Sequence, residues 1–135
     1  MRGAMITAVD SSILLDVLTD DPSYRASSAR SLRAARAAGR VIACPVVWGE
    51  IRGYFEDVER MHHLLAAAEI HFDPFDRECS DVAGSHWREY RRRGGSRSRL
   101  LADFLVAAHA HVRGGRLLTR DRGFYRRYFT KLEIV

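Results

Sequence analysis

The most constraining feature of this sequence is a set of four carboxylates, each at or near the end of a separate apolar segment. They are Asp10 after MITAV, Glu50 in CPVVWGEI, Asp103 in LLADFLVAA and Asp121 in RLLTRD. In an open α/β sheet the carboxyl ends of the parallel strands share one edge, and ligands bind at that edge. The pattern therefore predicts a sheet at whose edge the four acids meet.

Carboxylates that meet in this way need protons or a cation. Two of them about 4 Å apart, at an effective dielectric constant of about 20, repel each other by roughly 4 kcal/mol. Hard divalent cations take oxygen ligands, and magnesium keeps several waters besides. The sequence therefore predicts a Mg²⁺ or Mn²⁺ site formed by Asp10, Glu50, Asp103 and Asp121.

Each acid, taken alone, has a simpler explanation. Most single Asp and Glu residues cap a helix or carry a solvated charge in a loop. Capping does not require an acid in the interior of an apolar helical run, which is where the pattern places Asp103. Four acids at equivalent positions favour a shared site over four separate caps.

The periodicity of the apolar residues alternates between that of a strand and that of a helix. It predicts strands over 6–9, 41–44, 70–72, 117–119 and 132–135. It predicts helices over 11–18, 23–38, 45–68 and 76–93 and a short helical turn over 124–128. A further helix is predicted to be capped by Ser96 or Ser98 and to end at Gly114. We expect an α/β fold, a short parallel sheet of four or five strands flanked by helices on both faces.

Composition sets bounds on this fold. The 135 residues are 47% hydrophobic and 29% charged, which fits one domain over 1–135, with 1–4 as an extension ahead of a start at Met5. The formal net charge of +5 favours a polyanionic partner. Lys131 is the only lysine, and a bias toward arginine codons explains the charge equally well.

Several other classes of protein are not favoured. Cys44 and Cys79 lack C-x-x-C spacing, so neither a zinc ribbon nor a redox motif is expected, and a reducing cytoplasm is the simplest location. No signal sequence and no stretch near about 18 apolar residues occurs, so we expect no membrane anchor. His109 and His111 are two apart on a predicted helix and do not face each other, which favours structural or surface roles over zinc binding.

Four motifs together resemble a PIN domain, and most closely the bacterial VapC-type toxins. They are V-D-S-S-I-L-L-D-V-L over 9–18, P-V-V-W-G-E ending at Glu50, L-A-D-F-L-V-A-A around Asp103 and L-L-T-R-D-R-G-F over 117–124. The resemblance extends over almost the whole chain, and the order and spacing of the motifs are more specific than any one of them. It implies that the four acids correspond to the acidic quartet of the family.

The resemblance also implies roles for the residues of the site. Asp10 and Asp103 are expected to bind the metal directly, with Glu50 and Asp121 as further ligands, as water-mediated ligands or as a general base. Two hydroxyls, those of Ser12 and Thr119, are expected to orient carboxylates or waters from behind the ligands. Where the family often has Asn or Thr after the first acid, this chain has serines at 11 and 12.

The implied activity is that of a divalent-metal-dependent endoribonuclease, the toxin of a VapBC-type toxin-antitoxin pair. Such a protein is expected to be a homodimer and to be neutralised by a small antitoxin that reaches toward the acidic site. Arg97, Arg99 and Arg120 are expected to bind RNA, because guanidinium groups match phosphate oxygens. A solvated loop or a surface for an acidic partner would explain the same arginines.

Three alternatives remain to be weighed. A haloacid-dehalogenase phosphatase needs a second Asp two residues after the first, where this chain has Ser12. A response-regulator receiver needs a lysine late in the chain at a strand end, and Lys131 is poorly placed for it. The third alternative is a PIN-fold RNA-processing or RNA-binding protein that is not a toxin, against which the four intact acids argue only in part.

Overall fold

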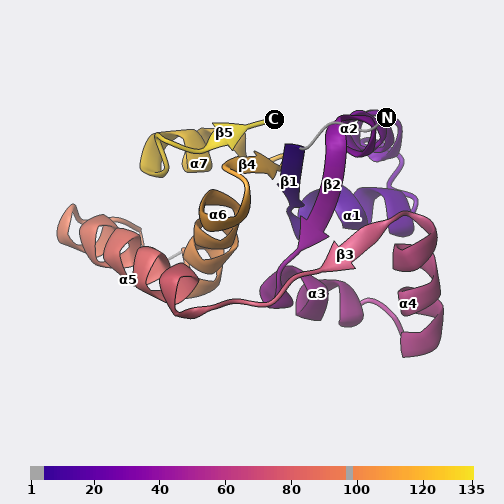
Figure 1. The fold of residues 1–135 in the computed structure, drawn as a ribbon, viewed down its shortest axis with the longest axis horizontal. Coiled ribbons are helices and arrows are strands. Elements are labelled where there is room, and N and C mark those ends of the chain that lie inside the picture. Colours follow the sequence, from indigo (N-terminus) through magenta and orange to yellow (C-terminus); the bar gives the residue numbers. More distant parts are fainter. Residues whose placement is uncertain (1–4, 97–98) are drawn as a thin grey trace.

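The structure is a computed structural model that describes residues 5–96 and 99–135. Strands and helices alternate along these residues (Figure 1). In chain order the elements are β1 (Met5–Val9), α1 (Ser11–Leu18), α2 (Arg25–Ala38), β2 (Gly39–Ala43), α3 (Pro45–Arg52), α4 (Val58–Ala67), β3 (Ile70–Phe72), α5 (Arg77–Arg92), α6 (Leu101–Arg113), β4 (Arg116–Leu118), α7 (Arg122–Tyr128) and β5 (Glu133–Ile134).

The strands form one parallel sheet in the order β3-β2-β1-β4-β5. At its centre, Thr7 of β1 is opposite Val41 of β2, and Ala8 of β1 is opposite Leu117 of β4. The chain first moves outward from β1 to β3 and then returns to add β4 and β5 on the other side. The strand order therefore reverses between β1 and β4, and ligands of open α/β sheets bind at such a switch point.

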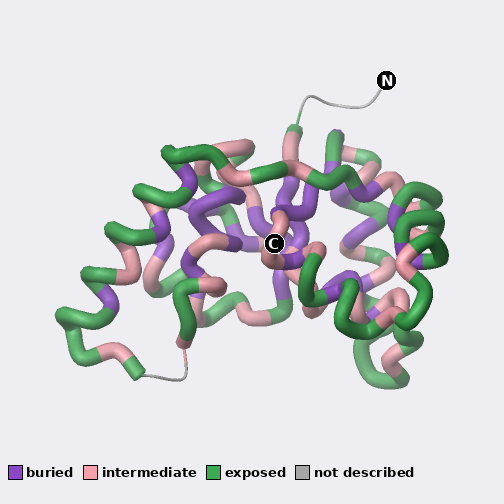
Figure 2. The backbone as a smooth tube through the Cα atoms, turned by 90° about the horizontal axis from the view of Figure 1, so that it is seen from below, coloured by how far each residue is buried: buried purple, intermediate pink, exposed green. Residues whose placement is uncertain are grey.

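Helices cover both faces of this sheet, which confirms the predicted α/β class. Helix α2 packs on β1, β2 and β4, whereas α6 packs on β1 and β4 and has α5 beside it. Right-handed crossovers place the helices of the two halves of the chain on opposite faces. Figure 2 shows the consequence, with buried residues in the middle of the molecule and exposed residues on its outer helices.

Two features of the buried interior agree with the sequence. At the centre of the sheet, Val9 of β1 and Val41 of β2 are each 1% exposed. Both cysteines are buried free thiols.

Among the described residues, no helix is both long enough and apolar enough to cross a bilayer.

The prediction of one continuous helix over 45–68 is wrong. Helix α3 ends at Arg52, and α4 begins only at Val58. Gly53 follows α3, where glycine is a poor helix former, and the carboxylate of Asp57 accepts the backbone N–H of Glu59 at 3.0 Å as an N-cap. Because the helix stops at Arg52, Tyr54 lies beyond it and is 67% exposed.

The predicted start of the helix that bears Asp103 is also wrong. Helix α6 begins at Leu101, so Ser96 is too early to cap it, and Ser98 lies outside the described residues. The carboxylate of Asp103 instead accepts the backbone N–H of Leu100 at 3.1 Å. Asp103 therefore lies in the first turn of α6 and not in the interior of a helical run, and it contributes to capping after all.

Gly39 is required by a close approach of two backbones. It ends α2, where its N–H donates to the carbonyl oxygen of Ala35, and it begins β2 opposite Met5. A Cβ atom at this position would lie 1.9 Å from the carbonyl oxygen of Met5. Any side chain at position 39 would therefore push β1 and β2 apart at their amino ends.

We expect Gly39→Ala to lower the free energy of unfolding by about 1–3 kcal/mol, the usual cost of overpacking. The matched control is Gly84→Ala in α5, where a Cβ would meet nothing within 4 Å and where alanine should stabilise the helix by about 0.5–1 kcal/mol. Urea denaturation of both variants measures the difference. Equal stabilities of the two variants would show that the close approach at Gly39 does not constrain the sheet.

Candidate active site

Asp10 lies at the switch point, directly after β1. Its backbone N–H donates to the carbonyl oxygen of Leu118, the last residue of β4, at 2.9 Å. Its carboxylate accepts the backbone N–H of Ser11 at 2.8 Å, as the N-cap of α1, and the hydroxyl of Thr119 at 2.8 Å. Both carboxylate oxygens are therefore held in fixed directions.

Thr119 connects the first acid of the chain with the last. Its hydroxyl is fully buried, donates to Asp10 and accepts the backbone N–H of Asp121 at 3.0 Å. A hydroxyl has only one proton to donate, so these two contacts fix its orientation. The turn after β4 is thus tied to the end of β1 through one side chain.

Glu50 approaches the same place from α3. A hydrogen bond from the Ser11 side chain reaches its carboxylate. Loss of hydration is the largest cause that raises the pKa of Glu50, and the negative charges of Asp10 and Asp103 raise it further, against the lowering effect of Ser11. The hydroxyl that contacts an acid is therefore that of Ser11, whereas the predicted Ser12 accepts the backbone N–H of Arg120 at 3.4 Å.

The charges of the four acids act on one another. Burial is the largest cause that raises the pKa of Asp10; the hydrogen bonds from Thr119 and Ser11 oppose it, and the charges of Asp103 and Asp121 add to it. Glu50 is coupled to Asp10 and Asp103 in the same way. The structure thus joins all four predicted acids in one electrostatic group at the carboxyl edge of the sheet.

Two buried neighbours, neither of which was predicted from the sequence, lie in the same negative field. Burial raises the pKa of the Cys44 thiol to about 11, and the charge of Asp10 contributes to the rise. Burial also raises the pKa of the Tyr125 phenol, with contributions from Asp10, Asp103 and Asp121. Both groups therefore remain neutral at physiological pH, and neither compensates the carboxylates.

A hard divalent cation fits the chemistry of these donors, because all four are carboxylates and one of them is buried and destabilised by its charge. In the part of the chain that the structure describes, no three His, Cys, Asp or Glu side chains stand close enough together to enclose a metal ion. The contacts of the acids give a reason. Asp121 is paired with Arg99, and Asp103 is turned toward the backbone of Leu100.

A sequence model of the PIN domain matches residues 7–130. This chain belongs to the PIN domain family. PIN domains are typically metal-dependent nucleases that use divalent ions. No curated protein is similar enough in sequence to count as a relative of this PIN domain.

Solved structures similar to this PIN domain include VapBC and FitAcB structures. VapBC2 from Rickettsia felis, bound to a DNA fragment from its promoter, matches with a TM-score of 0.77 at 17% identity, over 97% of this chain and 98% of that one. VapBC-1 from nontypeable Haemophilus influenzae matches with a TM-score of 0.73 at 17% identity, over 97% of both chains. FitAcB from Neisseria gonorrhoeae matches with a TM-score of 0.60 at 18% identity, over 95% of both chains. At these identities the likeness shows the fold.

Arg120, predicted to bind RNA, is paired with a carboxylate that the sequence analysis did not single out. Its Nε and Nη2 atoms donate to the two oxygens of Asp16 at 2.8 and 3.0 Å, and its guanidinium lies 4.0 Å from the ring centre of Tyr24. Asp16 is 3% exposed and also accepts the hydroxyl of Ser28 at 2.6 Å. A phosphate would have to compete with this pair for Arg120, whose evident effect is to fix the turn that carries Asp121.

Arg99, also predicted to bind RNA, pairs with Asp121 at the edge of the site. Its guanidinium lies over the ring of Phe124, 3.9 Å from the centre. Arg97, the third arginine predicted to contact RNA, lies outside the described residues.

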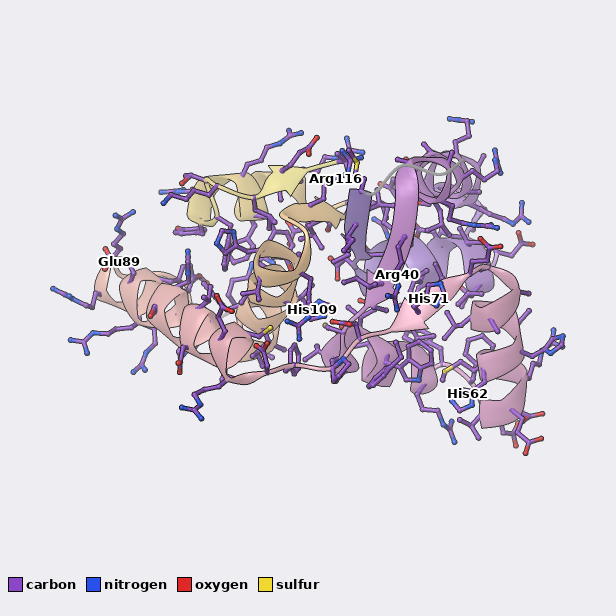
Figure 3. The ribbon with its side chains drawn as sticks, viewed as in Figure 1. Arg40, His62, His71, Glu89, His109 and Arg116 are labelled. Carbon is purple, nitrogen blue, oxygen red and sulfur yellow. The ribbon has the colours of Figure 1, made fainter. Side chains whose placement is uncertain are left out.

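His109 has a structural role on the other side of α6. The ring is fully buried, and its Nε2–H donates to Asp73 at 2.7 Å, which ties α6 to the segment that leads into α5 (Figure 3). Burial is the largest cause that lowers the pKa of His109, against the raising effect of Asp73. Arg113 completes the contact, with its Nε 2.7 Å from Asp73 and its Nη1 2.9 Å from Asp76.

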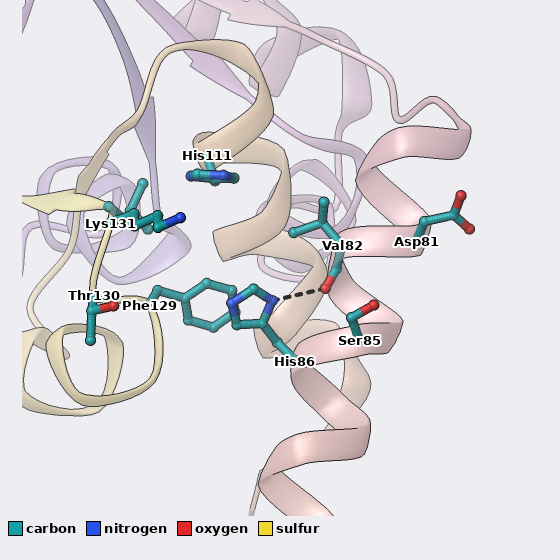
Figure 4. A pocket seen from close by; sticks show the side chains of 9 residues that line it. Asp81, Val82, Ser85, His86, His111, Phe129, Thr130 and Lys131 are labelled. Atoms are coloured by element: carbon teal, nitrogen blue, oxygen red, sulfur yellow. Dashed lines mark hydrogen bonds between the residues drawn. The ribbon is translucent and has the colours of Figure 1, made fainter.

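A hollow of about 380 Å³ lies apart from the four acids, between α5, the end of α6 and the segment before β5 (Figure 4). His86 stacks on Phe129 there, with ring centres 4.3 Å apart, and its Nδ1–H donates to the carbonyl oxygen of Val82 at 3.0 Å. Lys131 and Asp81 are both among the residues that line it. Their opposite charges give this hollow no single preference for a charged ligand.

We expect Asp16→Ala to lower the free energy of unfolding by about 2–4 kcal/mol, because it removes a buried partner of Arg120 and of Ser28. The matched control is Glu89→Ala in α5, which removes an exposed pair with Arg93 (2.9 Å; side chains 53% and 68% exposed) and should cost less than about 1 kcal/mol. Thermal and urea unfolding measure both. Similar losses in the two variants would contradict the role of the Asp16–Arg120 pair in holding the turn.

Proposed function

We propose that this PIN domain is a divalent-metal-dependent endoribonuclease, and that it is the toxin of a VapBC-type toxin-antitoxin pair. The observation that carries the proposal is the coupling of Asp10 to Asp103 and Asp121 at the switch point between β1 and β4. Such a group of acids is costly to the fold, since burial raises the pKa of Asp10 without an opposite charge beside it. A cost of this kind is expected where a protein binds a cation.

The fixed carboxylates would hold the cation. Asp10 is oriented by Ser11 and Thr119, and Asp103 stands in the first turn of α6, so we assign these two the direct coordination. A bound divalent ion would lower the pKa of a coordinated water and offset the negative charge that develops on the phosphate during its hydrolysis. Glu50 and Asp121 are assigned the remaining roles of further ligand, water-mediated ligand or base.

Glu50 is the better suited of these two to accept a proton. Its pKa is raised by loss of hydration and by its acidic neighbours, which brings it closer to physiological pH. In the proposed reaction a water attacks phosphorus and its proton passes to the Glu50 carboxylate. The bond from phosphorus to the leaving oxygen breaks, and that oxygen takes a proton from solvent to leave as a hydroxyl. Asp121 is less suited to this step, because it is already paired with Arg99.

RNA is the proposed substrate because the chain carries an excess of cationic side chains. The net charge of the chain is +5, and the last turns of α5 carry Arg88, Arg91 and Arg92 around one open hollow. Tyr90, on the buried side of the same turns, packs on Phe104 and Phe124 next to the acids. Guanidinium groups of this kind would bind the phosphates of a single strand.

The proposed biological role rests on the structural neighbours, which are toxin-antitoxin complexes. We propose a homodimer as the working form and a small antitoxin as the partner that blocks the acidic site. The alternative is an RNA-processing or RNA-binding PIN domain that is not a toxin. A short adjacent reading frame that encodes a DNA-binding protein, together with growth arrest relieved by that protein, would favour the toxin.

We expect Asp10→Asn and Asp103→Asn each to slow the cleavage of single-stranded RNA in Mg²⁺ at least about 100-fold, since each removes a proposed metal ligand. The control is Asp20→Asn, an exposed acid beyond the opposite end of α1 from Asp10, which should cleave at the parental rate. Gel analysis of a labelled RNA gives the rates, and circular dichroism checks the fold. Parental activity of either quartet variant would remove that residue from the proposed mechanism.

A further inference from the structure

The acidic group already holds one cation, the guanidinium of Arg99. Its Nη1 atom lies 2.5 Å from Oδ2 of Asp121, and the side chains are 28% and 43% exposed. The face of the guanidinium lies on the ring of Phe124, 3.9 Å from its centre. A carboxylate and an aromatic ring therefore hold Arg99 from two sides.

The position of Arg99 within the group is specific. The charges of both Asp121 and Asp103 act on its guanidinium. Among residues 5–96 and 99–135, no other arginine, lysine or histidine forms an ion pair with any of the four acids. Arg99 thus neutralises one of the acids that the proposed function assigns to the cation.

The surroundings allow Arg99 to leave this position without disturbing the core. It precedes the first turn of α6, where Leu100 is 65% and Leu101 is 44% exposed, so no buried packing depends on the backbone there. Asp121 would keep the hydrogen bond from its own N–H to Thr119 after such a change. The pair can therefore open while Asp10, Thr119 and Asp121 stay in place.

We propose that Arg99 is an internal counter-ion that competes with the divalent cation for Asp121 and is released from it when the cation binds. The inference rests on the proposed function, because it takes Asp121 as part of the cation site. A guanidinium and a divalent ion on one carboxylate repel each other, so the binding of one weakens the binding of the other. Released beside the site, the Arg99 guanidinium is free to pair with a phosphate of the RNA.

The test measures Mn²⁺ affinity by isothermal titration calorimetry at low ionic strength, with no RNA present. Arg99→Gln keeps a long side chain with a planar end but loses the charge. It should bind Mn²⁺ about three- to tenfold more tightly, the gain expected when a partly exposed ion pair and its ring contact no longer compete. Arg99→Lys keeps the charge and should stay within about twofold of the parent.

Arg127→Gln is the matched control. Arg127 lies on the ring of Tyr128, 5.4 Å from the centre, and has no carboxylate partner among the described residues, so its loss should leave Mn²⁺ affinity within about twofold of the parent. Unchanged or weaker Mn²⁺ binding by Arg99→Gln, including the case in which the variant merely melts at a lower temperature, would overturn the inference. It would mean that Arg99 only supports the fold.

Failure of the proposed function would look different. In that case the parent protein would show no Mn²⁺ binding that Asp10→Asn or Asp103→Asn removes. If the parent binds Mn²⁺ through these acids and Arg99→Gln does not tighten the binding, the cation site stands and the competition by Arg99 is wrong. If Arg99→Gln tightens the binding and Arg99→Lys does not, the cation site and the competition by Arg99 are both supported.

Discussion

The uncompensated charge of Asp10 is the constraint on which this structure depends. The carboxylate ends the central strand, caps α1 and accepts the Thr119 hydroxyl, so the sheet, the first helix and the turn after β4 all meet at it. Burial raises its pKa, and the neighbouring acids add to the rise. The same position that joins the two halves of the fold therefore carries a free-energy cost, which a cation would relieve.

Arginines compensate the acids around the site and leave its centre without a positive charge. Arg120 neutralises Asp16, Arg99 neutralises Asp121, and Arg113 neutralises Asp73. In the described part of the chain, neither Asp10 nor Glu50 nor Asp103 has such a partner. Uncompensated negative charge thus remains at the switch point, where ligands of open α/β sheets bind.

Periodicity predicted most of the fold because each strand and helix has its own apolar pattern. The five strands and the start of α3 at Pro45 follow from such local signals. The break between α3 and α4 was missed because the apolar pattern continues across it. The only local signals of the break are Gly53 and the N-cap Asp57, which are weak indicators by themselves. The start of α6 was missed because its cap comes from Asp103 within the helix and not from a serine before it.

The acids of the site could be named from the sequence, but their partners could not. Asp10 and Asp121 come after strands, Asp103 lies in the first turn of α6, and Glu50 lies in the second turn of α3. The topology then brings such positions together. Which side chain pairs with which is decided by packing across the fold. The Arg120–Asp16 and Arg99–Asp121 pairs join residues 104 and 22 positions apart, and no local pattern marks them.

The most direct test of this account is the effect of Mg²⁺ and Mn²⁺ on the thermal stability of the parent and of Asp10→Asn. If charge at Asp10 destabilises the fold and a cation relieves it, either ion raises the melting temperature of the parent in a concentration-dependent way. The variant without metal melts above the metal-free parent and gains little from either ion. A variant that melts below the metal-free parent, or that gains as much from the ions as the parent does, would contradict the account.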